Sequence, residues 1–276
     1  MAERFELFRL SLLPKPYRDI FAGPDVTRET YIRTVFAEEI IYKYNDEQYH
    51  YVPMLESFGQ DVIAGRLGKR LTIEENMPPS EGLAETTREA WRASRIVIDP
   101  TEHADGQKVA VENNRSVASP ANILLGLVRQ INRNHPESIY SIEAAPIIET
   151  ESFWDFAERN KGKITSIRFD FVAPNMLGTS DSMTEELRDF RQKEKAHRIS
   201  LELQNKHGLN VETEKTREAV EYIGKSGGTI RAKAKRGANY TSTDKTRFGI
   251  IPEPDLGEES AIDRIARFAK QILGRV

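Results

Sequence analysis

The residues with the clearest chemical potential lie near the C-terminus, between Lys225 and Arg247. This segment holds seven basic residues and one acidic residue, and it includes Gly227, Gly228 and Gly237. Dense positive charge attracts polyanions, because a cation that meets a phosphate releases a condensed counterion. Glycines remove the side chains that would otherwise keep a ligand away from the backbone. The segment therefore predicts a local contact with nucleic acid.

The spacing of the charges within this segment sharpens the prediction. Arg231, Lys233 and Lys235 alternate with alanines. On a strand, alternate side chains point to one face and lie roughly 6–7 Å apart. Phosphates along one nucleic-acid strand have a similar separation, so this face can follow a backbone. Tyr240 adds an aromatic ring for stacking on a base.

The predicted nucleic-acid contacts form two groups. The larger group is the basic hairpin, with Arg231, Lys233, Lys235, Arg236, Tyr240, Lys245 and Arg247. The smaller group lies in the run GRLGKR and consists of Arg66, Lys69 and Arg70.

A structural interpretation competes with the functional one. Lysines also occur on the exposed edge strands of sheets, where they prevent edge-to-edge aggregation. A solvated edge strand defended in this way has the same sequence pattern. A third interpretation is that the basic strand contacts an acidic protein, so the sequence alone leaves three explanations open.

The composition limits the classes of function. The 276 residues contain no cysteine, which excludes disulfides, thiolate metal sites and a cysteine nucleophile. The net charge is −3, so any polyanion site must be local. The opening MAERFELFRL lacks the apolar core of a signal peptide, and no stretch approaches the ~20 apolar residues of a membrane-spanning helix. We therefore expect a cytoplasmic protein with no membrane contact.

Motifs for catalysis and metal binding are weak. Asp99, Glu102, His103 and Asp105 offer oxygen and imidazole ligands, but Asp-Pro and Asp-Gly are also turn formers. There is no Walker A motif and no GxSxG motif. We expect no cofactor and no bound metal, and an enzyme is the less favoured class.

A metal-dependent nuclease is nevertheless kept as an alternative. Such an enzyme needs carboxylates and a lysine around a metal ion. The residues of the right type are Glu212, Glu214 and Lys215, with Asp170 or Glu143 as partners from neighbouring strands.

The elements that position the basic hairpin are a mixture of strands and helices. Turn residues predict one hairpin from 39–44 and 48–55 and another from 95–99 and 108–112, whereas 71–82 is expected to be a loop and 83–92 a short helix. Ser119-Pro120 predicts a helix start, and Phe153, Trp154 and Phe156 a short helix. Strands are expected at 140–148 and 164–172, and the segments 229–240 and 245–251 are expected to pair with each other. An amphipathic helix is expected at 262–272.

The segment from Ser182 to Asn205 is expected to be one long charged helix, because it opens with a capping box. Its polar middle makes it a candidate surface for a homodimer. Strands and helices intermix without regular βαβ alternation, which predicts an α+β protein. We expect a β-rich N-terminal domain with hairpins at 1–115, and a mixed C-terminal domain at 116–276 with the long helix and the basic hairpin.

The C-terminal half also resembles a known group of proteins. The run SFWDFAERNKGKITSIRFDFVAPN, the charged helix after it and AVEYIGKSGGTIRAKAKRG are similar in plan to prokaryotic phage-defence proteins of the RexA-type abortive-infection exclusion family. The resemblance covers residues 120–250 and rests on pattern. It implies a role in defence, DNA contact through Arg231, Lys233, Lys235 and Arg236, and a partner protein of the defence system.

The expectation from sequence is therefore a DNA-binding sensor or effector in antiphage defence. The alternatives are a metal-dependent nuclease toxin and a non-catalytic adaptor that binds proteins.

Overall fold

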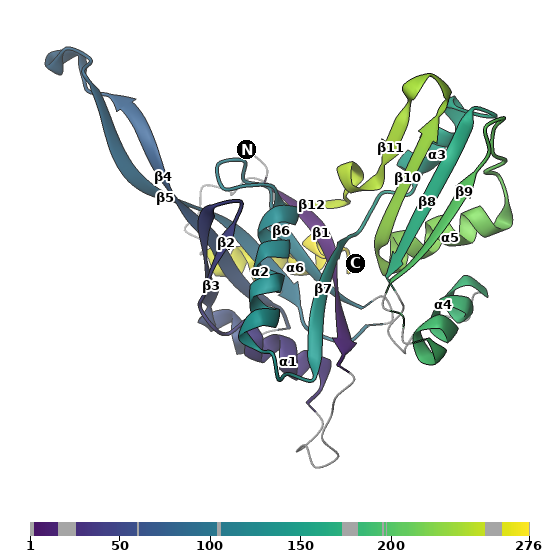
Figure 1. The fold of residues 1–276 in the computed structure, drawn as a ribbon. Helices are drawn as coiled ribbons and strands as arrows, with labels where there is room; N and C mark the ends of the chain where they lie inside the picture. The colour runs from purple at the N-terminus through teal and green to yellow at the C-terminus, as the bar shows by residue number, and fades with distance from the viewer. Residues whose placement is uncertain are drawn as a thin grey trace.

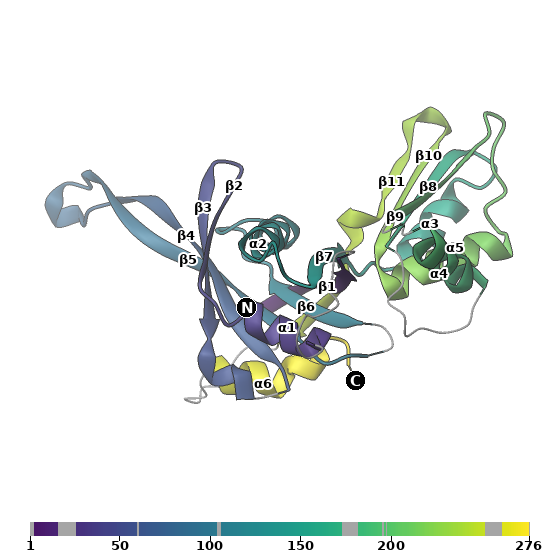
Figure 2. The same ribbon diagram turned by 60° about the horizontal axis from the view of Figure 1, so that its bottom comes forward.

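The computed structural model describes residues 3–15, 26–59, 61–103, 106–172, 182–194, 196, 198–251 and 261–275. These residues form two antiparallel sheets with helices packed against them, which agrees with the α+β prediction (Figures 1 and 2). A long two-stranded arm projects from one side of the molecule, and the smaller sheet lies on the opposite side.

The first sheet has eight strands in the order β12-β1-β6-β5-β4-β3-β2, with β7 also paired to β1. The strands are β1 (Glu3–Pro14), β2 (Ile40–Tyr44), β3 (Glu47–Met54), β4 (Ile63–Asn76), β5 (Glu85–Asp99), β6 (Gln107–Glu112), β7 (Tyr140–Pro146) and β12 (Phe248–Ile251). Helices α1 (Arg28–Val35) and α2 (Pro120–Asn134) cover one face, and α6 (Ala261–Ile272) covers part of the other. The residue expected as a domain boundary, 115, lies between strands of this one sheet.

Both predicted hairpins of this sheet are confirmed. Asn45 and Asp46 have φ angles of 48° and 63°, the left-handed conformation that a tight two-residue turn between β2 and β3 requires. Strands β5 and β6 pair from Ile96 opposite Val111 to Asp99 opposite Lys108. Local turn chemistry was sufficient to predict these pairs, because their partners are close in sequence.

The helix at 83–92 is wrong, and the loop at 71–82 is right only for 77–82, because residues 71–76 and 85–92 are strands of the arm. Strands β4 and β5 pair without interruption from Ile63 opposite Ile98 to Asn76 opposite Glu85. A 3-10 turn, Pro79–Glu81, closes the tip. No residue between 71 and 93 is buried. Leu71 and Ile73 alternate with polar residues, but the alternation does not continue from Glu74 to Ala90, so the strand pattern is too short to recognise.

The second sheet has the order β11-β10-β8-β9. Its strands are β8 (Ile164–Val172), β9 (Arg198–Gln204), β10 (Gly228–Ala234) and β11 (Asn239–Thr241). Helices α3 (Glu151–Arg159), α4 (Ser182–Lys193) and α5 (Glu214–Ser226) contribute side chains to a shared core against one face (Figure 2). The predicted strand at 164–172 and the predicted short aromatic helix are confirmed, with Phe153 and Phe156 in that core.

Two predictions about this region are wrong. The long helix from Ser182 to Asn205 ends at Lys193, and Arg198–Gln204 form β9. Ile199 and Leu203 are four residues apart, which is typical of a helix, but Leu201 completes an alternating strand pattern. The 245–251 segment does not pair with 229–240, because β10 pairs with β11 and β12 pairs with β1.

The two sheets meet where α5 leads into β10. Arg9 of β1 is buried and donates a hydrogen bond from Nη1 to the carbonyl of Lys225, at 3.2 Å. A Cβ at Gly227 would lie 3.2 Å from the Ala145 side chain of β7. Gly227, between α5 and β10, therefore allows close packing between the two sheets.

Candidate nucleic-acid interface

Strand β10 presents its basic residues on the open face of the second sheet. Ile230, Ala232 and Ala234 are buried toward the helices, whereas Arg231 and Lys233 are exposed on the other face. The alternation predicted from the sequence is therefore confirmed for these two cations.

The interior position of β10 corrects the edge-strand interpretation. Strand β11 lies on one side of β10 and β8 on the other. The two cations sit on a strand that is already paired on both sides, where no edge needs protection. Protection against edge pairing therefore does not explain Arg231 and Lys233.

The neighbours of these cations are polar across the whole sheet. Arg231 lies opposite Thr241 of β11 and Arg168 of β8, and Lys233 lies opposite Asn239 and Ser166. Opposing side chains on one face of an antiparallel sheet lie within about 4.5–5.5 Å at Cβ. Hydroxyl, amide and cationic groups at this spacing can bind phosphate and sugar oxygens together.

Asp170 organises the other end of this open face. Its Oδ1 accepts hydrogen bonds from Ser200 Oγ at 2.6 Å and Arg168 Nε at 2.9 Å, and its Oδ2 accepts one from Thr229 Oγ1 at 3.3 Å. Partial burial pushes the pKa of Asp170 upward, but these hydrogen bonds and the Arg168 charge outweigh it and hold the pKa below its ordinary value. Arg168 is thereby neutralised, which leaves Arg231 and Lys233 as the accessible positive charge of the two central strands, while the exposed Glu202 of β9 lies opposite Arg168.

The remaining residues of the predicted basic hairpin are scattered. Lys235 and Arg236 are exposed in the turn after β10, where Lys235 Nζ donates to the carbonyl of His207 at 3.2 Å. Arg247 is exposed just before β12 in the first sheet. The side chain of Lys245 lies outside the described residues.

Tyr240 is not available for base stacking, contrary to expectation. Only 7% of it is exposed, and its ring packs against Phe153 and Phe156 with centroids 5.7 and 5.5 Å away. Its hydroxyl forms a hydrogen bond with Ser152 Oγ at 2.8 Å. Strand pairing explains the error, because Tyr240 lies opposite Ala232 and must face the core with it.

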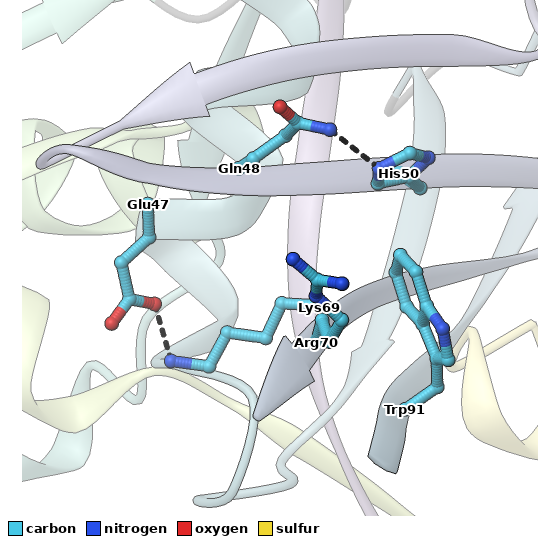
Figure 3. A pocket seen from close by; sticks show the side chains of 6 residues that line it. All are labelled: Glu47, Gln48, His50, Lys69, Arg70 and Trp91. Atoms are coloured by element: carbon cyan, nitrogen blue, oxygen red, sulfur yellow. Dashed lines mark hydrogen bonds and ion pairs between the residues drawn. The ribbon is translucent and has the colours of Figure 1, made fainter. Parts of the chain in front are cut away.

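The second predicted basic group is only partly brought together, because Lys69 and Arg70 line one hollow and Arg66 does not. A hollow of about 540 Å³ lies at the base of the arm. Figure 3 shows the side chains that line it, which are Glu47, Gln48, His50, Lys69, Arg70 and Trp91. Lys69 forms an ion pair with Glu47, and Arg70 forms one with Glu89 at 2.9 Å. Arg66 is exposed outside this hollow, opposite Val52 and Arg95. Because carboxylates already neutralise Lys69 and Arg70, this group is a weaker phosphate site than β10.

Sequence reasoning missed Trp91, the most exposed aromatic feature of this hollow. Its exposed fraction is 58%, and the ring of His50 meets it edge-on with centroids 4.9 Å apart. The signal was hidden because Trp91 sits in a segment expected to be a helix. On β5 it lies opposite Arg70 instead.

The charged residues of the predicted nuclease site form ion pairs with different partners. Glu212 pairs with Lys161 at 2.7 Å, Lys215 with Glu186 at 3.0 Å, and Glu143 with Arg198 at 3.4 Å. Arg198 lies two residues before Ser200 on β9, so the Glu143 pair is near Asp170, but each of these side chains has a charged partner of its own.

The acidic turn is also held by ion pairs. The buried Asp99 lies 2.7 Å from Arg275 and 3.1 Å from His103, and Glu102 lies 3.9 Å from Arg28. Asp105 lies outside the described residues. Within the described parts of the chain, no group of three or more His, Asp or Glu side chains is placed to hold a metal ion.

No protein-family model, no curated protein and no solved structure matches the chain. In the described ranges, no helix has the length and apolar character needed to cross a bilayer.

Proposed function

We propose that this protein binds nucleic acid through the open face of the sheet β11-β10-β8-β9. One observation carries the proposal: Arg231 and Lys233 lie exposed on an interior strand, and neither forms an ion pair with a described carboxylate. Hydroxyl and amide groups surround them. Such a face suits phosphate contacts, which fix a nucleic acid in place without reading its sequence.

The form of nucleic acid follows from the side chains of the face. With Tyr240 in the core, the described side chains of the open face include no aromatic ring. Single-strand binders without sequence preference rely on such rings, whereas duplex binders can rely on backbone contacts. We therefore propose a duplex as the ligand, bound with little dependence on sequence, and we propose DNA rather than RNA on the basis of the sequence resemblance.

The biological setting rests on sequence resemblance alone. Residues 120–250 resemble RexA-type exclusion proteins in pattern, and we propose on that basis a sensor or effector in antiphage defence. The open sheet face would then contact DNA while a partner protein of the same system binds elsewhere.

Charge reversal tests the proposal directly. The variant Arg231→Glu/Lys233→Glu should bind a fluorescein-labelled DNA duplex at least about tenfold more weakly than the wild type at low salt, because two phosphate contacts become repulsive. Fluorescence anisotropy measures the affinity. The control variant Lys43→Glu/Arg129→Glu changes the net charge equally on exposed residues of β2 and α2, and it should bind like the wild type. Equal affinity of all three proteins would reject the proposed face.

The same assay separates the two alternatives. Magnesium-dependent cleavage of the duplex would support the nuclease. No binding of DNA or RNA at low salt, together with retention of an acidic protein, would support the adaptor.

A further inference from the structure

Strand β9 is the outer strand of the second sheet, and its free edge is unprotected. Six of its seven residues are exposed, and within the described residues no strand pairs with its outer side. Proteins protect such edges with charged side chains, above all lysine, with proline or with bulges. The two charged residues of β9 have partners of opposite sign, because Arg198 pairs with Glu143 at 3.4 Å and Glu202 lies opposite Arg168. The sequence RISLELQ contains no lysine or proline, and its pairing with β8 shows no register shift.

The hydrogen-bond pattern shows which backbone groups point outward. The amide of Asn205 donates to the carbonyl of Thr165 at 2.9 Å, and the adjacent pair is Gln204 opposite Ser166. In antiparallel sheets, hydrogen-bonded pairs alternate with pairs that are not hydrogen-bonded. The odd-numbered residues of β9 therefore bond to β8. The amides and carbonyls of Ser200, Glu202 and Gln204 point toward the free edge.

The helix-facing side of β9 is apolar and incompletely covered. Leu201 and Leu203 are 37% and 36% exposed, although the residues opposite them on β8, Phe169 and Ile167, are fully buried. The helix layer therefore stops short of the edge. Burying these two leucines would stabilise any complex that extends the sheet here.

We propose that a second copy of this chain occupies the edge, with the two β9 strands paired antiparallel about a two-fold axis at Leu201. This register places Leu201 opposite Leu201 and Ile199 opposite Leu203, and it joins Ser200 to Glu202 by backbone hydrogen bonds. Every apolar side chain of β9 then meets an apolar side chain, and no like charges face each other. A two-fold interface must be self-complementary in this way.

The neighbouring registers fit less well. A register centred on Glu202 places two carboxylates opposite each other, which is destabilising. A register centred on Ser200 leaves Leu203 without a partner in β9. Shifting the register by one residue would place even-numbered residues, whose backbone groups point outward, opposite odd-numbered residues, whose backbone groups already bond to β8.

The pairing would join two four-stranded sheets into one of eight strands with both open faces on the same side. The two β10 strands would be five strand spacings apart, or about 24 Å. The dimer therefore presents two rows of Arg231 and Lys233. Its existence does not depend on the proposed DNA binding and is tested separately.

Because the chain has no cysteine, a single introduced cysteine reports the register. In the proposed dimer the two Leu201 Cα atoms lie about 4.5 Å apart, within disulfide reach. Full-length Leu201→Cys should form a covalent dimer under mild oxidation, seen on a non-reducing gel. Leu203→Cys is the matched control, with nearly equal exposure on the same face of the same strand. Its two copies would be roughly 14 Å apart and should not cross-link.

A mixture of Ile199→Cys and Leu203→Cys proteins tests the same register with different residues and should give only the mixed dimer. In light scattering, the wild type should have twice the 31.5 kDa mass of the chain. The variant Leu201→Arg should have the mass of one chain, and its melting curve should be the same as that of the wild type. A monomeric wild type would overturn the proposal. Cross-linking that is absent or equal in Leu201→Cys and Leu203→Cys would also overturn it.

Discussion

At the scale of single residues, the open sheet face depends on which charges are left free. Arg168 and Asp170 neutralise each other within a network that includes Ser200 and Thr229. The free cations are then Arg231 and Lys233, and sequence alternation alone identified both. It could not show that Tyr240 faces inward, because its orientation is set by pairing with β10 rather than by neighbours in sequence.

The lowered pKa of Asp170 leads to a prediction about stability and pH. A carboxylate with a pKa below its unfolded value stabilises the fold above that unfolded pKa of about 3.9, and this stabilisation is lost as the pH falls through the folded pKa. At pH 7, Asp170→Asn should therefore have a lower free energy of unfolding than the wild type, measured by urea denaturation. The difference should shrink steadily below pH 4. A constant difference between the proteins at all pH values would show that ionisation of Asp170 does not contribute.

At the scale of elements, β10 requires a close approach to β8 where it begins. Gly228 has φ of +146°, and a Cβ there would lie 2.4 Å from the backbone carbonyl oxygen of Asp170. Gly237 also has positive φ, +81°, but a Cβ there would meet no atom within 4 Å. A side chain at either position would strain the backbone, but only one at Gly228 would also clash with a neighbouring atom.

We expect Gly228→Ala to lower the free energy of unfolding by about 2–4 kcal/mol, because strain and a backbone clash add together. Gly237→Ala should cost only about 1 kcal/mol, from strain alone. Urea denaturation of both variants checks the prediction. Equal losses would mean that the strand can shift away from β8 at Gly228.

The arm formed by β4 and β5 should be removable without loss of the fold. None of its residues between 71 and 93 is buried, and the ion pair of Arg70 with Glu89 is exposed. Replacing residues 72–89 with Asn-Gly leaves Leu71 and Ala90, which are already opposite each other, beside a two-residue turn. The free energy of unfolding should change by less than about 1 kcal/mol, because only exposed contacts are lost. A large loss of stability would place the arm in the core.

Sequence reasoning found elements whose signals are local and missed those defined by distant partners. The turn at Asn45-Asp46 and the helix start at Ser119-Pro120 were predicted from neighbouring residues. The pairing of β12 with β1 joins Ile251 to Glu3, and no local pattern reveals it. Strand β9 was missed because Ile199 and Leu203 fit a helix as well as a strand.

At the scale of the whole molecule, a net charge of −3 means that DNA binding must come from one surface. A protein with a few phosphate contacts should show a modest dependence of affinity on salt, whereas a globally basic protein shows a steep one. The proposed dimer would double the number of phosphate contacts, and each contact would still be made by Arg231 or Lys233.

The most direct test of the proposed DNA interface is the slope of log affinity against log salt concentration for duplex DNA. Each lost phosphate contact should reduce the magnitude of this slope by about 0.9 per monomer. Arg231→Gln and Lys233→Gln should each lower it by about this amount, and the double variant by about twice as much. Slopes in these variants equal to that of the wild type would contradict DNA binding by the open sheet face.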